Sequence, residues 1–281
     1  MVHLKSSERG RLLKLMVRRA VSTLRAGHHW SKYHGAGLAF DEVRPYQPGD
    51  EVRNIDWNVT ARMGQPYIKR YREERELHII FILDISSSLK TGQAKVSKRD
   101  IAAQLLALLS VSGLHFGDSL GLILFGKNIE SYLPPRRGLR HAMKLMHQAL
   151  YQEPKLPGTS IAQALKFANH IIKKRSVVVV LSDFLDQHYE TQLGKLTHRH
   201  EVYALQVRDP LDMGIPSTGL VNLVDSETGV AMLVDSEEVR IETPVPVRNS
   251  KVRWVSVNTW GNPAQQLMLS LAQQRRRPQS R

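Results

Sequence analysis

Apolar and polar positions along the chain divide it into two parts with different patterns. In the first part, residues 6–25 carry apolar side chains at helical spacing, which predicts an amphipathic helix. Residues 35–76 then alternate short extended pieces with a turn-rich centre, which predicts a small strand-rich extension. We therefore assign residues 1–76 to an N-terminal helix and extension, and residues 77–281 to the main domain.

In the main domain, apolar runs alternate with segments of helical periodicity. The runs at 77–84 and 176–182 are typical of strands that are buried on both faces of a parallel sheet. Further strands are expected at 119–126 and 201–207, and a hairpin pattern at 221–235 and a last strand at 253–258 follow. The expected fold class is α/β, with a three-layer, doubly wound and mostly parallel sheet. Helices are expected at residues 99–112, 138–151, 160–173, 188–197 and 262–276.

The charge of the chain changes this picture only a little. Its 281 residues carry a formal net charge of +14, but the basic residues are dispersed over short clusters without interleaved aromatic residues. A solvated basic surface is therefore the simpler interpretation, and nucleic-acid binding with a steep salt dependence is the alternative. The apolar runs are too short to span a bilayer, the N-terminus lacks a signal-peptide pattern, and cysteine is absent. We expect a soluble, cytoplasmic protein.

Five side chains with oxygen atoms follow predicted strands or precede predicted helices: Asp84, Ser86, Ser88, Thr159 and Asp183. In a doubly wound sheet with the strand order 3-2-1-4-5-6, ligands bind at the carboxyl ends of strands 1 and 4, which are the positions of the two carboxylates. Each residue alone has a simpler role as a helix cap, but their joint order favours a shared site. Carboxylates and hydroxyls are the hard ligands that Mg²⁺ prefers, so we predict a Mg²⁺ site, with Mn²⁺ as the alternative ion.

Catalysis would also need a nucleophile or a general base within reach of this site. The histidine nearest to either carboxylate in sequence is His188, which is best interpreted as a solvated helix residue. The segment Gly117 to Gly121 matches the G-x-S-x-G pattern, but Ser119 should enter a strand at the opposite edge of the sheet instead of opening a helix. We expect no enzymatic activity, and a metal-dependent phosphoesterase that uses the same five residues is the alternative.

The D-x-S-x-S, G-T and S-D blocks that contain the five residues resemble the metal-ion-dependent adhesion site of von Willebrand factor A domains. The segment 34–76 resembles the signature of the bacterial family called domain of unknown function fifty-eight. The resemblance implies that the three hydroxyl groups hold the metal, and that Asp84 and Asp183 contribute directly or through water. It also implies that an acidic group of a protein partner completes the coordination, and that this partner is a MoxR-type AAA+ ATPase.

We therefore predict a non-enzymatic, divalent-metal-dependent protein-binding module, an adaptor or co-chaperone of such an ATPase. The prediction includes no specific nucleic acid and no membrane span. The signature segment contains five further charged or aromatic residues: Asp50, Arg53, Asp56, Trp57 and Arg62. The favoured interpretation is that they form an ion-paired, aromatic-anchored collar that fixes the extension to the sheet. The alternative is that they form a second recognition surface.

Overall fold

The computed structural model describes residues 36–74, 77–90, 96–213, 219–224, 231–235 and 251–276. It divides the chain into two compact units, one formed by His29–Leu77 and the other by Met1–His28 together with His78–Arg281. The amphipathic helix predicted at residues 6–25 lies outside the described residues.

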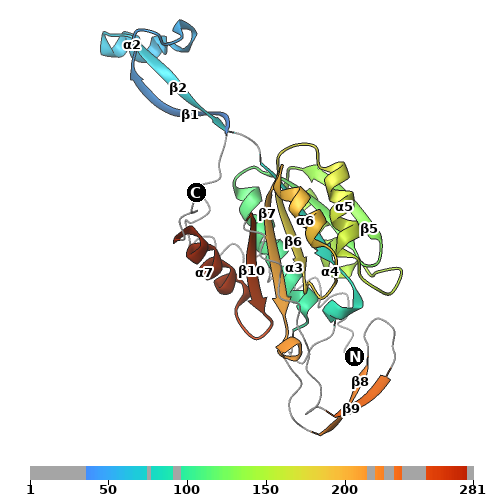
Figure 1. Cartoon of the computed structure of the whole chain (residues 1–281). Helices are drawn as coiled ribbons and strands as arrows, with labels where there is room; N and C mark the ends of the chain where they lie inside the picture. Colours follow the sequence, from blue (N-terminus) through green and yellow to red (C-terminus); the bar gives the residue numbers. More distant parts are fainter. Residues whose placement is uncertain are drawn as a thin grey trace. The chain divides into compact units, whose positions relative to one another are not determined.

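The larger unit is built on a six-stranded sheet with the order β10-β7-β6-β3-β4-β5 (Figure 1). All neighbouring strands are parallel except β4 and β5, which are antiparallel. This is the doubly wound order that the sequence predicts, with its switch point between β3 and β6. The strands are β3 (His78–Asp84), β4 (Ser119–Phe125), β5 (Ile129–Arg136), β6 (Val177–Ser182), β7 (Glu201–Arg208) and β10 (Val252–Asn258).

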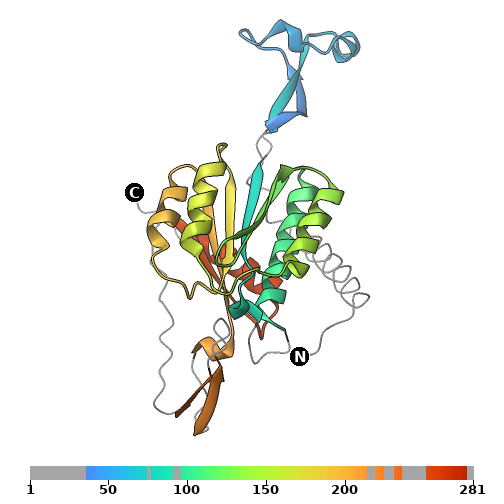
Figure 2. The same ribbon diagram turned by 90° about the vertical axis from the view of Figure 1, so that its right-hand side faces the viewer.

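Helices cover both faces of this sheet, so the predicted three-layer α/β fold is confirmed (Figure 2). Helices α5 (Ile161–Ile171) and α6 (Glu190–Thr197) pack on one face, while α3 (Lys98–His115), α4 (Leu139–Tyr151) and α7 (Pro263–Arg276) lie on the other. The core on the α5 side joins apolar residues of five strands to helices α5 and α6. Because strands β3 and β4 are buried along almost their whole length, their sequences are apolar without alternation.

The edge strand β5 was not located by the sequence pattern, for a physical reason. Along this strand only Leu133 is buried, and Pro134 and Pro135 interrupt the residues that would mark a strand. Proline is tolerated here because an edge strand has a side without ladder hydrogen bonds. The predicted hairpin is present as β8 (Leu220–Val224) paired antiparallel with β9 (Ala231–Asp235), and its turn lies outside the described residues.

The smaller unit consists of an antiparallel pair, β1 (Ala36–Pro45) and β2 (Tyr67–Glu74), and two short helices between them, η2 (Val52–Asn54) and α2 (Trp57–Met63). Two of its signature carboxylates have local roles.

Asp56 caps α2 by accepting hydrogen bonds from the backbone N–H groups of Asn58 and Val59, and Asp50 pairs with Arg44 at 2.7 Å. Trp57 is 68% exposed. The collar that would fix the extension to the sheet stays a prediction.

Candidate functional site

The predicted ligands meet where the strand order reverses. Asp84 is the last residue of β3, and Asp183 directly follows β6, the parallel neighbour of β3. Leu83 lies opposite Leu181 in the register of the two strands, so both carboxylates project from the same edge. We call this the carboxyl edge of the sheet. The sequence-based expectation that the two residues converge at this crevice agrees with their positions.

Asp84 is the most enclosed group of the site, with no exposed surface. Its Oδ1 accepts a hydrogen bond from the backbone N–H of Ser86 at 2.9 Å, and its Oδ2 accepts one from the hydroxyl of Ser182 at 2.8 Å. Burial, together with the negative charge of Asp183, raises the pKa of Asp84 from 3.8 to about 7. A carboxylate in this position is therefore unfavourable by itself and would be stabilised by a nearby cation.

The hydroxyl groups of Ser86 and Ser88 lie side by side in the loop after β3. Their Oγ atoms are 2.9 Å apart, and either can donate the hydrogen bond that joins them. Ser86 is buried and Ser88 is half-buried, so of the two hydroxyl-bearing residues Ser88 is the more accessible to solvent. The alternation of Asp84, Ser86 and Ser88 thus brings three oxygen-bearing groups together, as the sequence spacing predicted.

The turn after β6 fixes the position of Asp183. Phe184 has a φ of 57°, in the left-handed region that a non-glycine residue rarely adopts. Its N–H donates to the Ser182 hydroxyl at 3.1 Å, and its buried ring packs against Tyr189 and Trp254 with centroids 5.6 and 4.9 Å apart. This packing offsets the strain of the backbone, so Asp183 is held in a defined position at the carboxyl edge.

Thr159 lies in the loop before α5, and two hydrogen bonds hold this loop at the same edge. The N–H of Ser160 donates to the carbonyl of Gly126, just after β4, at 2.9 Å. The N–H of Ile161 donates to Oδ2 of Asp186, just after Asp183, at 2.7 Å. Since the ends of β4 and β6 both anchor the loop, all five predicted ligands lie at the carboxyl edge.

Sequence reasoning missed one participant, Lys98, which begins α3. Its side chain is only 3% exposed, and its Nζ lies 3.0 Å from Oδ2 of Asp183 and 3.0 Å from Oδ1 of Asp212. Burial lowers the pKa of Lys98, but the two carboxylates together raise it above its ordinary value, so the ammonium group stays charged. Asp183 therefore already has a cationic partner and is less available than Asp84 for direct metal coordination.

The donor set fits a hard divalent cation. Two carboxylates and three hydroxyls are the oxygen ligands that Mg²⁺ accepts. The carboxylates of Asp84, Asp183 and Asp212 outnumber the single ammonium group of Lys98, which leaves excess negative charge for a cation to balance. In the described part of the chain, no three His, Cys, Asp or Glu residues are grouped so that they could hold a metal ion. The predicted ligand set differs from such a group, because three of its five members are hydroxyl groups.

The two candidate catalytic residues are not part of this site. Ser119 is the first residue of β4, lies opposite His78 and is 4% exposed, so it is at the edge of the sheet opposite Asp84, as predicted. His188 is exposed, as predicted, but it lies in the loop before α6 and not in the helix expected at 188–197, because α6 begins at Glu190.

Comparison with known proteins gives the family and the fold. Residues 42–251 match the sequence profile of the family described as protein of unknown function DUF58. An uncharacterized protein of Mycobacterium tuberculosis is 33% identical over 223 residues, which cover 78% of this chain and 70% of the relative. A von Willebrand factor type A structure from Catenulispora acidiphila is similar, with 9% identity, a TM-score of 0.40, and coverage of 72% of this chain and 42% of that chain. The doubly wound α/β sheet order is the one expected from the sequence, and von Willebrand factor A domains are among the structures similar to this chain.

The prediction of a cytoplasmic location needs correction. An aerotolerance-related membrane protein from Bacteroides fragilis is among the similar structures, with 18% identity, a TM-score of 0.47, and coverage of 69% of this chain and 97% of that chain. Its description as a membrane protein contradicts the expected location. Among the described residues, we find no helix with the length and apolar character that a membrane crossing requires. The sequence argument was too broad, because the lack of a long apolar run bears on a spanning helix and not on location.

Proposed function

The chain belongs to the family described as protein of unknown function DUF58, and we propose that it is a protein-interaction module whose binding depends on a divalent metal ion. The family and the von Willebrand factor A-like fold suggest protein interaction. The observation that supports metal dependence is the buried carboxylate of Asp84 beside the paired hydroxyls of Ser86 and Ser88. These groups are hard ligands at the position where doubly wound sheets bind their ligands.

In this proposal, each residue of the site has a separate role. Ser86, Ser88 and Thr159 supply hydroxyl ligands, and Asp84 supplies negative charge whose orientation is fixed by Ser182. Asp183, held by Lys98, acts through water. A bound Mg²⁺ or Mn²⁺ would offer an open coordination position to a carboxylate of the partner protein. We propose binding without catalysis, because the described groups around Asp84 offer hydroxyls and a charge-paired lysine but no pairing of a nucleophile with a general base.

The proposed partner is a MoxR-type AAA+ ATPase, and the family resemblance of the signature segment supports this choice. The test is calorimetric titration of the purified ATPase into this protein, in Mg²⁺ and in chelator. Asp84→Asn is the variant of the site, and Asp118→Asn is the matched control, since Asp118 is also a buried aspartate but lies beside Ser119 at the opposite edge. We expect binding in Mg²⁺ for the wild type and the control, and none for Asp84→Asn. Equal binding in chelator would contradict metal dependence.

A further inference from the structure

Most described carboxylates of the larger unit lie at the carboxyl edge of its sheet, whereas basic residues occur at both edges. The parallel strands begin at the amino edge, and the antiparallel strand β5 ends there. We call the exposed basic residues of this edge the basic rim: Arg136, Arg137, Arg140, Lys173, Lys174, Arg175, Arg199 and Lys251. Of the described carboxylates in this unit, Asp118 and Glu201 alone lie at the same edge. Asp118 is 8% exposed, and Glu201 is paired with Arg253.

The basic rim crosses the whole width of the sheet. Lys251 directly precedes β10, whose first residue lies opposite Val202 of β7. The backbone N–H of Glu201 donates to the carbonyl of Ser176 at 3.0 Å, which joins the loops before β7 and β6. At the other end, Arg136 lies opposite Leu120 near the start of β4. Six strands spaced about 4.8 Å apart give the rim a length of about 24 Å.

Helix stability accounts for only part of this charge. Lys173, Lys174 and Arg175 follow the C-terminal end of α5, where the helix dipole favours cations. Arg137 and Arg140 instead flank the start of α4, where the dipole disfavours them. The first turn of α4 contains no acidic residue, and its N-cap residue makes no side-chain hydrogen bond to the helix. The helix dipole of α4 therefore does not account for the position of these two arginines.

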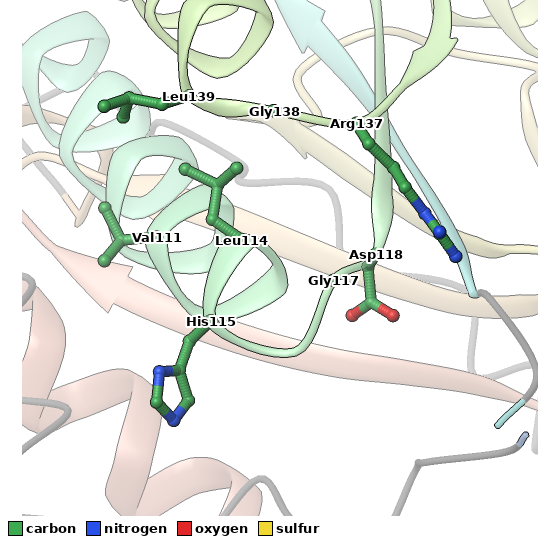
Figure 3. A pocket seen from close by; sticks show the side chains of 8 residues that line it. All are labelled: Val111, Leu114, His115, Gly117, Asp118, Arg137, Gly138 and Leu139. Carbon is green, nitrogen blue, oxygen red and sulfur yellow. The ribbon is translucent and has the colours of Figure 1, made fainter. Parts of the chain in front are cut away.

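Aliphatic surface accompanies the cations at the same place. Leu139, between the two arginines, is 61% exposed, and Met143 one turn later is 49% exposed. The adjoining cavity has a volume of about 540 Å³. Among the residues that line it, Figure 3 shows Val111 and Leu114 of α3 on one side and Arg137 on the other. The amino edge thus combines positive charge with apolar side chains that stay in contact with solvent.

We propose that the basic rim docks the protein on an anionic phospholipid surface, with the side chain of Leu139 entering the interfacial layer. An anionic bilayer is complementary to both properties, because it offers phosphate groups to the cations and acyl chains to the aliphatic residues. Nucleic acid would satisfy the cations only, and the rim does not present the exposed aromatic residues on which bases stack. This inference is independent of the metal site, which lies at the opposite edge of the sheet.

The test is co-sedimentation of the full-length protein with vesicles of phosphatidylcholine alone, or with about one third phosphatidylglycerol. Each rim cation should contribute about fivefold in affinity, so the triple variant Lys173→Gln, Lys174→Gln, Arg175→Gln should bind anionic vesicles about a hundredfold more weakly. The matched control replaces three exposed lysines outside the rim, as Lys127→Gln, Lys155→Gln and Lys166→Gln, and should change binding less than about twofold.

Two further measurements separate the roles of charge and apolar contact. The double variant Arg136→Gln, Arg140→Gln should weaken binding and reduce its salt dependence. Leu139→Ser should weaken binding and leave the salt dependence unchanged. The proposal is overturned if the wild type binds neutral and anionic vesicles equally, if it binds neither, or if the control and rim triple variants lose the same affinity. Rim-dependent binding of duplex DNA without vesicle binding would also overturn it, in favour of a nucleic-acid surface.

Discussion

Replacing Asp84 by Asn should stabilise the metal-free protein while removing its response to Mg²⁺. Asn has nearly the same shape and keeps both hydrogen bonds, since its Oδ1 can accept from the N–H of Ser86 and its Nδ2 can donate to the Ser182 hydroxyl. What the substitution removes is a buried negative charge that faces Asp183. The sign of the expected change is therefore opposite to that of most substitutions of a buried residue.

The magnitude follows from the raised pKa of Asp84. Folding shifts this pKa from 3.8 to about 7, and each pKa unit corresponds to about 1.4 kcal/mol. The carboxyl group favours the folded state below its unfolded pKa, and this contribution is lost as the pH rises through about 7. At about pH 8 the ionised group costs about 4 kcal/mol, so Asp84→Asn should raise the free energy of unfolding by about 2 to 4 kcal/mol in chelator.

The assay is urea unfolding of wild type and variant at about pH 5 and about pH 8, in chelator and in saturating Mg²⁺. The stabilisation should be largest at the higher pH and less than half as large at the lower one, because the unfolded carboxyl group is still ionised at about pH 5. Mg²⁺ at a hundred times its dissociation constant should stabilise the wild type by about 2.7 kcal/mol and leave Asp84→Asn unchanged. A variant that is less stable than wild type at the higher pH in chelator would refute this reasoning, as would an equal response of both proteins to Mg²⁺.

Three further substitutions test other parts of the structure. Lys98→Met removes the cation between Asp183 and Asp212, so it should destabilise the metal-free protein by about 3 kcal/mol in urea unfolding. It should also tighten Mg²⁺ binding measured by calorimetry, because the ammonium group of Lys98 competes with the metal ion for Asp183. Weaker Mg²⁺ binding would contradict this competition. Ser86→Ala should weaken Mg²⁺ binding at least tenfold with a stability loss of about 1 kcal/mol, and unchanged affinity would remove this hydroxyl from the ligand set. Asp56→Ala removes the cap of α2, which should cost about 1 kcal/mol and leave Mg²⁺ binding unaltered; a loss of Mg²⁺ binding would show coupling that the structure does not explain.

The sequence indicated most of the fold and the position of the candidate site, because those features depend on local patterns. Buried parallel strands must be apolar along their length, so the sequence locates them. Residues at the carboxyl ends of such strands meet where the strand order reverses, so Asp84 and Asp183 could be placed together from the sequence alone. Lys98 could not be found in this way. A lysine in the first turn of a helix is normally solvated, and this one is buried only because Asp212, 114 positions later, approaches it. The hairpin was found because turn residues separate its two apolar runs, whereas β5 is an exposed edge strand with two prolines and no apolar run.

The gathering of carboxylates around Lys98 at the carboxyl edge has a kinetic consequence. An acidic partner that approaches the carboxyl edge meets the carboxylates of Asp84, Asp183 and Asp212, whose excess over the ammonium of Lys98 repels it at distances comparable to the screening length. A cation at this edge would turn the repulsion into attraction. We therefore expect the divalent ion to accelerate the encounter itself, so that chelation lowers the association rate constant as well as shortening the lifetime of the complex.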